Sequence, residues 1–196
     1  MRIEKRTVGP LETNAYLLFS DDGRRVLLVD PGAEADRLRE ACGGLTPDGI
    51  LLTHGHADHI GALEAMREGG VPVAVFRADA EYLTDGALNL SRMLGLRLSC
   101  RPADRLLEEG PCELGGWRFE VLHTPGHTPG SCCFLFDGVL FSGDTLFSGG
   151  YGRTDFPGGD PAQLFGSLRR LSGLPEETRV LPGHGPETVI GRERVL

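Results

Sequence analysis

Short apolar runs separated by polar turns dominate the first third of the chain. Two of these runs flank the polar turn SDDG, which is the pattern of a β-hairpin. The runs predict four strands, at residues 14–19, 25–30, 49–53 and 72–76. Apolar residues at helical spacing, followed by glycines, predict helices at residues 34–42 and 60–67. The first half is therefore expected to alternate strands with short helices.

The second half repeats this organisation. Residues 78–95 have a weak helical pattern, and residues 96–112 have no clear pattern. Four further runs predict strands at residues 117–122, 132–136, 139–142 and 178–181. Residues 161–171 predict a helix, because Asp160 is a suitable cap, Pro161 suits the first turn and three leucines fall on one face. Two strand-rich halves with flanking helices indicate an α/β (α+β) fold in which two sheets pack together with helices outside.

The bulk properties favour an ordinary globular protein. The 196 residues suit a single domain, expected to span 1–196, which can bury a core without disulfides or a structural metal. The net charge of −8 argues against nucleic acid as a partner, because phosphates call for clusters of Lys and Arg. The first residues contain no secretory signal, and no run is apolar enough for a membrane span.

The cysteines indicate a reducing compartment. The chain has five of them, an odd number with no CxxC motif, and Cys132 and Cys133 lie in an apolar strand-like run. This pattern favours reduced, mostly buried thiols. We therefore expect a cytoplasmic protein.

Five of the six histidines, together with Asp58 and Asp144, lie in four short polar segments, each directly after a predicted strand. The segments are THGHADH at 53–59, TPGHTPG at 124–130, SGDT at 142–145 and PGHG at 182–185. Loops at strand ends are where a rigid scaffold presents functional groups. The sixth histidine, His123, lies outside these segments and is expected to be structural or to support a neighbouring metal ligand.

Imidazole and carboxylate groups are the usual ligands of zinc and similar metals. The four segments supply seven such groups, which exceeds the need of one tetrahedral site and indicates two sites that share a carboxylate. His54 and His56 are two residues apart, so that a turn can direct both to one metal ion. Asp58 and His59 come as the chain turns into a helix, and they are expected to face a second ion.

These segments resemble the signature motifs of the metallo-β-lactamase superfamily. THGHADH matches its THxHxDH motif, and TPGHTPGS, SGDTLF and PGHGP match the later motifs in the same order. The resemblance covers essentially the whole chain, and it is strongest to short bacterial proteins of the glyoxalase II-like group, which carry GRTDFPGGD as residues 152–160 do. It implies a four-layer αββα sandwich.

The resemblance also implies the role of each ligand. The first metal ion would be bound by His54, His56 and His127. The second would be bound by Asp58, His59 and His184, with Asp144 bridging the two. We expect two divalent ions, zinc first, with iron or manganese also suitable. Asp58 is expected to act in catalysis as well, by orienting the water that the metal ions convert to hydroxide.

The expected reaction is hydrolysis of a small-molecule thioester of the hydroxyacylglutathione kind. True β-lactamases lack the bridging aspartate, so the presence of Asp144 disfavours antibiotic hydrolysis. The main alternative is an enzyme similar to the persulfide dioxygenases, in which His54, His127 and Asp144 would hold one iron ion. A non-catalytic metal-binding or redox-partner module is a third, weaker alternative, because such a module has little use for an open two-metal site.

Arg153 and Tyr151 are the candidate substrate-binding residues, whereas Phe147, Phe156 and Trp117 are expected in the core. Full-length glyoxalase II enzymes use a C-terminal helical domain to hold glutathione. The present sequence ends about a dozen residues after His184. We therefore expect weak saturation by glutathione thioesters, with Arg153 supplying the remaining charge recognition.

Overall fold

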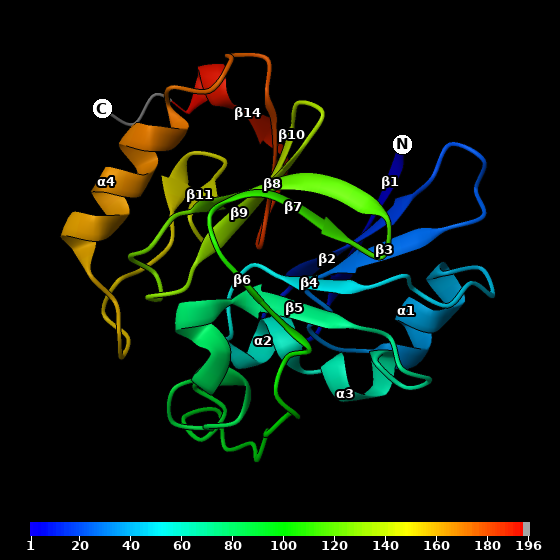
Figure 1. The fold of residues 1–196 in the computed structure, drawn as a ribbon. Coiled ribbons are helices and arrows are strands. Elements are labelled where there is room, and N and C mark those ends of the chain that lie inside the picture. The colour runs from blue at the N-terminus through cyan, green and yellow to red at the C-terminus, as the bar shows by residue number, and fades with distance from the viewer. Residues whose placement is uncertain (194–196) are drawn as a thin grey trace.

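The structure, a computed structural model that describes residues 1–193, has four layers in the order helices, sheet, sheet, helix (Figure 1). The first sheet has the order β1 (Arg2–Val8), β2 (Thr13–Phe19), β3 (Val26–Val29), β4 (Ile50–Leu52), β5 (Val73–Phe76), β6 (Arg105–Leu107). The second has the order β14 (Thr188–Val189), β13 (Arg179–Pro182), β10 (Val139–Gly143), β9 (Cys132–Phe136), β8 (Trp117–His123), β7 (Gly110–Leu114). A small hairpin pairs β11 (Leu146–Phe147) with β12 (Gly150–Tyr151). The expected four-layer sandwich is confirmed.

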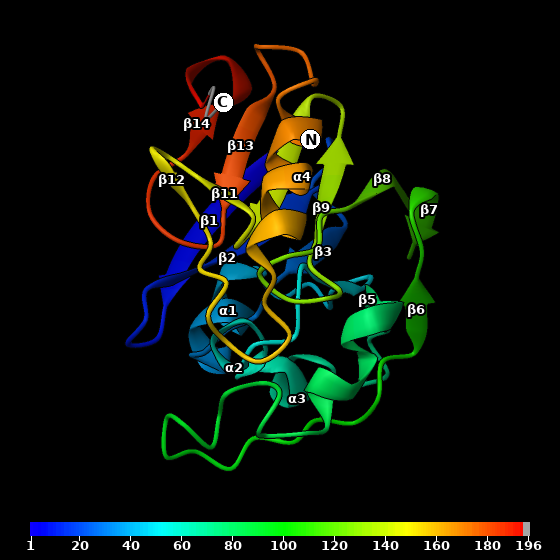
Figure 2. The same cartoon turned by 90° about the vertical axis from the view of Figure 1, so that its left-hand side faces the viewer.

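Helices cover the outer face of each sheet (Figure 2). The first sheet is covered by α1 (Ala35–Ala41), α2 (Ala57–Ile60) and α3 (Leu63–Met66). The second sheet is covered by α4 (Pro161–Leu171). Two 3-10 helices complete the fold, η1 (Arg77–Leu83) and η2 (Ile190–Arg192).

Three hydrophobic clusters fill the three spaces between the layers. Leu17 and Leu28 pack under Leu38 of α1 and Leu63 of α3. Their sequence neighbours, such as Leu18, point the other way and pack between the two sheets. Because the central strands are covered on both faces, they appear in the sequence as continuous apolar runs.

The third cluster lies between the second sheet and α4, where Leu164, Leu168 and Leu171 are buried. The start of α4 is fixed by Asp160, whose carboxylate accepts hydrogen bonds from the backbone N–H groups of Ala162 and Gln163. The helix has the predicted bounds, because cap, first-turn proline and apolar stripe all agree.

The predicted helix over residues 60–67 is wrong. The chain instead forms two single turns, α2 and α3, separated at Gly61 and Ala62. The backbone N–H of Ala62 donates to Pro31 O, and a Cβ on Gly61 would lie 2.2 Å from Gly32 O. Close packing against the loop after β3 therefore interrupts the helix at this point.

The weak helical pattern of residues 78–95 also gives only η1, followed by turns without regular structure. Asn89 replaces the helical bonds: its amide donates to Tyr82 O and Leu98 O, and its Oδ1 accepts from Ser91 N. Leu90 has a φ of 68°, which no helix allows.

The pattern also failed to predict several strands at the edges of the structure. These are β1, β6, β7, β11, β12 and β14, which are short or alternate polar with apolar residues.

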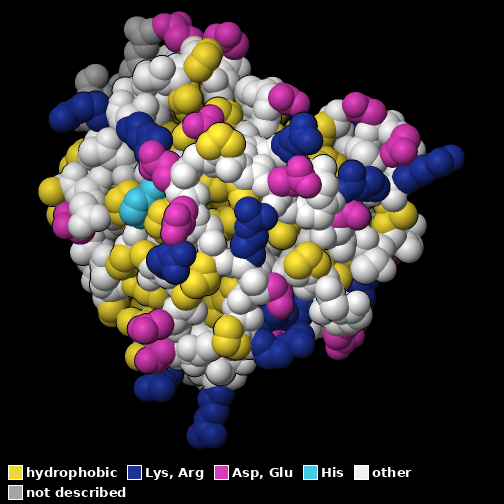
Figure 3. Space-filling model, viewed as in Figure 1, with side chains coloured by type: hydrophobic (Ala, Val, Ile, Leu, Met, Phe, Trp, Pro, Cys, Tyr) yellow, Lys and Arg dark blue, Asp and Glu magenta, His cyan; other side chains and the backbone are white. Residues whose placement is uncertain are grey.

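Trp117 is buried between the sheets as expected. All five cysteines are free and four of them are buried, as expected. Within residues 1–193, no helix is long and apolar enough to cross a membrane. On the face drawn in Figure 3, acidic and basic side chains are interspersed with hydrophobic ones.

Candidate metal centre

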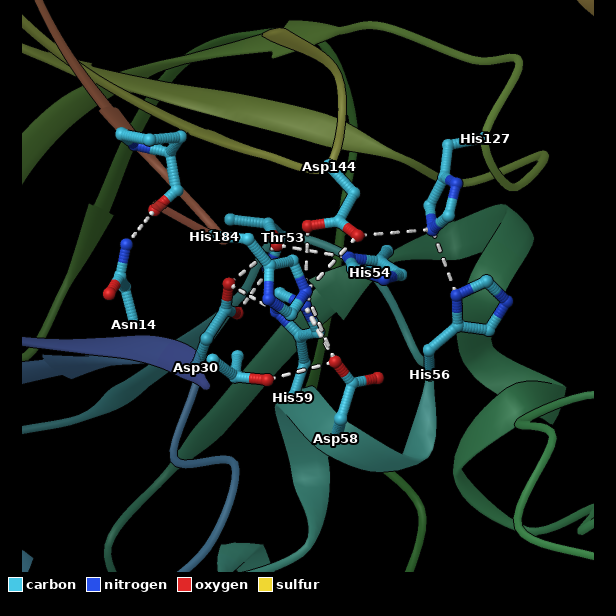
Figure 4. A network of polar contacts seen from close by, with 12 residues as sticks. Asn14, Asp30, Thr53, His54, His56, Asp58, His59, His127, Asp144 and His184 are labelled. Atoms are coloured by element: carbon cyan, nitrogen blue, oxygen red, sulfur yellow. Dashed lines mark hydrogen bonds and ion pairs between the residues drawn. The ribbon is translucent and has the colours of Figure 1, made fainter. Parts of the chain in front are cut away.

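Four loops bring the candidate ligands together at one edge of the two sheets. The loops follow β4, β8, β10 and β13, as the sequence predicted. Seven side chains from these loops and from α2, which follows the first loop, point toward a common centre (Figure 4). They are His54, His56, Asp58, His59, His127, Asp144 and His184.

Three histidines form one group of potential ligands. Ligand atoms of His54, His56 and His127 all lie within 4.8 Å of one another. The Nδ1 atom of His56 is 2.9 Å from Nε2 of His127. Two ring nitrogens at this distance need a shared proton or a cation between them.

Asp58, His59 and His184 form a second group with the same spread of at most 4.8 Å. Nε2 of His184 is 3.2 Å from Oδ2 of Asp58, and Nε2 of His59 is 3.5 Å from that oxygen. This group combines two imidazoles with one carboxylate, a donor set suited to a divalent ion of borderline softness.

Asp144 lies between the two groups. Its Oδ1 is 3.3 Å from Nε2 of His59. Its Oδ2 is 3.6 Å from Nε2 of His127 and 3.5 Å from Nε2 of His184. One carboxylate thus faces histidines of both groups, which is the placement that a shared ligand requires.

Hydrogen bonds outside the centre fix the orientation of three rings. Nδ1 of His127 is 2.7 Å from the backbone oxygen of Arg153, and Nδ1 of His184 is 3.0 Å from the backbone oxygen of Leu11. Nδ1 of His59 is 2.9 Å from Oδ2 of Asp30. Because each Nδ1 donates outward, each Nε2 is directed into the centre.

Two buried aspartates that the sequence analysis missed support these loops. Asp30 follows β3 directly and also accepts hydrogen bonds from the N–H and hydroxyl of Thr53. Asp79 accepts from Gly55 N, Gly130 N and the hydroxyl of Thr128, and so it ties two histidine-bearing loops together. Asp30 could have been found from its position at a strand end. Asp79 lies in the weak helical stretch and gives no such signal.

Burial and charge divide the histidines into two electrostatic classes. Burial and the neighbouring histidines hold the pKa of His54 well below its usual range and lower the pKa of His56 to about 3. Burial opposes the protonation of His59 and His184 too, but the two nearby carboxylates outweigh it. The pKa of His59 therefore lies well above its usual range, and the pKa of His184 rises to about 10.

The residues present fit bound metal ions. Among the described residues, four buried side-chain atoms have no hydrogen-bond partner, and all four belong to this centre: His54 Nε2, His56 Nε2, His59 Nε2 and Asp144 Oδ1. Leaving such atoms unsatisfied costs roughly 1–3 kcal/mol each, whereas a metal ion would satisfy several at once. The packing is also close, because a Cβ on Gly183 would lie 2.2 Å from Asp144 Oδ1.

A cavity of about 490 Å³ opens above the centre. Both candidate substrate residues line it, Tyr151 and Arg153. The guanidinium of Arg153 is paired with Asp155 and lies 4.1 Å from the ring centre of Phe156.

The expectation that Phe147 and Phe156 belong to the core is wrong, because both are half-buried and line this cavity. Both lie in the segment between β10 and α4, outside the three hydrophobic clusters. His123 lies outside the centre, stacked on Phe76 and bonded to Pro129 O, as expected of a structural residue.

Comparison with curated proteins identifies relatives that match almost end to end. The chain is 44% identical over 202 residues to the probable metallo-hydrolase YqgX of Bacillus subtilis, covering 99% of this chain and 95% of the relative. It is 37% identical over 203 residues to the hydroxyacylglutathione hydrolase GloC of Haemophilus influenzae, with the same coverage of 99% and 95%.

Solved structures of similar proteins include three with different described properties. BLEG-1, a B3 metallo-beta-lactamase, superposes with a TM-score of 0.94 at 43% identity, covering 100% of this chain and 97% of that one. TTHA1623 in a di-iron-bound form gives 0.85 at 46% identity, covering 97% and 96%. ETHE1 from Myxococcus xanthus gives 0.82 at 33% identity, covering 99% and 82%.

The family model of the metallo-beta-lactamase superfamily matches residues 8–184, a range that includes all seven candidate ligands. The match agrees with the four-layer fold and with the relatives that cover nearly the whole chain. The protein is thus a member of the metallo-beta-lactamase superfamily.

Proposed function

We propose that the protein hydrolyses thioesters of small thiol carriers, of the hydroxyacylglutathione kind, at a two-metal centre. The observation that carries this proposal is the position of Asp144 between two complete ligand groups beneath an open cavity. The similarity to GloC, a hydroxyacylglutathione hydrolase, supports the same reaction class.

The ligand assignment is part of the proposal. His54, His56 and His127 would hold one ion; Asp58, His59 and His184 would hold the other; Asp144 would contact both. When bound, the ions would supply an activated water and an electrophile that polarises the thioester carbonyl. Zinc suits the donor set, and iron and manganese remain compatible with it.

Asp58 is the candidate catalytic residue. Its Oδ2 accepts a hydrogen bond from the hydroxyl of Thr13 at 2.9 Å and faces His184. Asp58 lines the cavity, and within the described residues its Oδ1 has no hydrogen-bond or ion-pair partner. This oxygen is free to accept a hydrogen bond from the attacking water and so to orient it. A thiolate leaving group needs no prior protonation, so the site requires no separate general acid.

Two alternative reactions follow from the similar structures. ETHE1 favours the persulfide dioxygenase alternative, in which His54, His127 and Asp144 would hold one iron ion. Asp58, His59 and His184 would then have no ligand role, although they form a complete second group. BLEG-1 makes β-lactam hydrolysis the other alternative to test.

One experiment separates these reactions. The protein is loaded with zinc alone and assayed without oxygen against a hydroxyacylglutathione thioester and a β-lactam. It is then loaded with ferrous iron and assayed for oxygen uptake with glutathione persulfide. We expect thiol release from the thioester with zinc and without oxygen, because zinc has no redox chemistry. Activity only with iron, persulfide and oxygen, or only with the β-lactam, would overturn the proposal.

A further inference from the structure

A second cavity lies next to the one above the metal centre. It has a volume of about 700 Å³ and is formed by the β1–β2 turn, the loop after β3, the start of α2 and residues 94–98. The two cavities share three lining residues: Leu11, Asp58 and Leu94. Asp58, the candidate catalytic residue, therefore borders both spaces.

The second cavity is lined mostly by apolar side chains. Three of the leucines that line it are exposed to solvent, although leucine side chains are usually buried. Their exposed fractions are 47% for Leu11, 44% for Leu94 and 55% for Leu96. Pro10 adds to the apolar surface at the opening, and the buried Val8 and half-buried Leu98 extend it inward. Exposed leucines that gather around one concave surface are typical of a ligand-binding site.

The charged residues of this cavity offer little to a polar ligand. Glu34 already accepts a hydrogen bond from Gly9 N and pairs with Arg37. Arg97 is exposed, so its guanidinium can stay in water while its methylene groups extend the apolar lining. A glutathione or nucleotide-type carrier needs several hydrogen-bonding partners, whereas most side chains that line this cavity are apolar.

A thioester has two arms on either side of its carbonyl carbon, and Asp58 borders both cavities. The cavity with Arg153 and Tyr151 suits the polar thiol carrier. We infer that the second cavity binds the acyl arm, and that the substrates are thioesters of extended apolar acyl chains rather than of two- or three-carbon acids. This inference rests on the proposed thioester hydrolysis. A three-carbon acyl group would leave most of the 700 Å³ unfilled.

The test is a series of glutathione thioesters from acetyl to decanoyl, assayed with zinc-loaded protein. Each methylene that enters the cavity should raise kcat/KM by up to about fourfold, the effect of burying one CH₂. In parallel, binding of S-methyl-, S-hexyl- and S-decylglutathione is measured by calorimetry. These thioethers have no carbonyl to hydrolyse, so their binding reports on the cavity independently of turnover.

A matched pair of variants locates the effect. Leu96→Asp places a charge in the cavity at an exposed position, and we expect it to remove most of the gain with chain length in both measurements. Leu106→Asp changes another exposed leucine, 39% exposed on β6 and outside both cavities, and should keep the full gain.

The outcomes separate this inference from the function on which it rests. Hydrolysis of all thioesters at one rate, with equal binding of the three thioethers, would overturn the acyl cavity and leave thioester hydrolysis standing. No turnover of any thioester, with binding that still strengthens with chain length, would overturn the proposed reaction alone. If both variants lose the increase with chain length equally, the acyl chain does not bind in the second cavity.

Discussion

The metal floor and the cavity walls of this protein are built in different ways. The metal floor, which we define as the seven candidate ligands, comes from loops directly after strands and from α2. Three of its histidines, His59, His127 and His184, have hydrogen bonds outside the centre. The cavity walls, Leu11, Leu90, Met93, Leu94, Phe147, Tyr151, Arg153 and Phe156, come largely from segments with little regular structure. Floor residues such as His54 and His59 are at most 1% exposed, whereas Met93 is 62% exposed.

This difference follows from what each part must do. Buried polar groups carry a large penalty unless every one has a partner, so the metal floor permits few substitutions. Substitution of an exposed apolar side chain around a cavity costs little folding stability, so the cavity walls tolerate different residues. Substitutions in the floor are therefore expected to abolish activity, and substitutions in the walls to alter selectivity. The predictions below test that division.

The largest effect is expected from Asp144→Ala. Because Asp144 faces histidines of both ligand groups, its loss should lower metal content from about two equivalents and reduce turnover on the order of a thousandfold, or about 4 kcal/mol of barrier. Metal analysis and thioester turnover measure these effects. Asp36→Ala, at a fully exposed carboxylate on α1, is the control. Full metal content in Asp144→Ala would show that the carboxylate is not shared.

Asp58→Ala should come next. It removes one second-group ligand and the carboxylate that orients the attacking water, while the outer hydrogen bonds of His59, His127 and His184 remain. We expect turnover to fall at least about a hundredfold, or roughly 3 kcal/mol of barrier. A variant within tenfold of the unmodified protein would place Asp58 outside the reaction.

Asp79 tests whether the supports of the floor matter as much as the ligands. Asp79→Asn replaces an acceptor with a group that cannot accept from Gly55, Gly130 and Thr128 together. We expect metal affinity to fall about tenfold, the lower end for residues that hold ligand-bearing groups. Thr128→Val removes only one of these bonds and should weaken binding less. Unchanged metal affinity in both variants would assign Asp79 to folding alone.

Metal uptake should release protons. In the metal-free protein the carboxylates raise the pKa of His184 to about 10 and hold the pKa of His59 well above its usual range. This stabilisation of the metal-free fold is fully present below the ordinary histidine pKa and is lost as pH rises through about 10. A metal ion must displace these protons, so metal affinity should increase with pH over that window. Titration calorimetry at pH 7 in buffers of different ionisation enthalpy should show about two protons released per chain. If metal binding releases no protons, His59 and His184 are not protonated in the metal-free protein.

The smallest effect is expected in the cavity walls. Arg153 is exposed and already paired with Asp155, so its charge is partly neutralised before a substrate arrives. Arg153→Ala should raise KM for glutathione thioesters roughly two- to threefold and leave kcat nearly unchanged, as loss of uniform binding does. A large fall in kcat with constant KM would instead give Arg153 a role in the chemical step.

The same contrast explains what the sequence could predict. The floor was predictable because short polar motifs after apolar runs are local patterns, and those patterns agree with the strand ends that carry His54 and Asp144. Two packed sheets with helices outside followed from the strand-rich halves of the sequence, and the resemblance to the metallo-β-lactamase superfamily implied the four layers. The structure shows why the strands appear as continuous apolar runs, because neighbours such as Leu17 and Leu18 face opposite cores. Local pattern and three-dimensional position coincide in these cases.

The supports and the walls depend on contacts between distant residues. Asp79 acts through Thr128, 49 residues away, and no local pattern announces that bond. Phe156 looked like a core residue because it is large and apolar, yet it packs against Arg153 at the cavity. The turns around Asn89 replaced an expected helix because side-chain hydrogen bonds competed with backbone ones. Such competition is decided by tertiary structure.

Leu11 and Arg153 each divide two tasks between main chain and side chain. Their backbone oxygens hold the rings of His184 and His127, while their side chains line the space above the metal centre. Every amino acid has the same backbone oxygen, so the ring-holding bond does not depend on which side chain is present. A library that randomises positions 11 and 153 should therefore contain many proteins with intact metal binding and altered substrate preference. The geometry makes these two positions natural points of entry for redesigning selectivity without rebuilding the reactive centre.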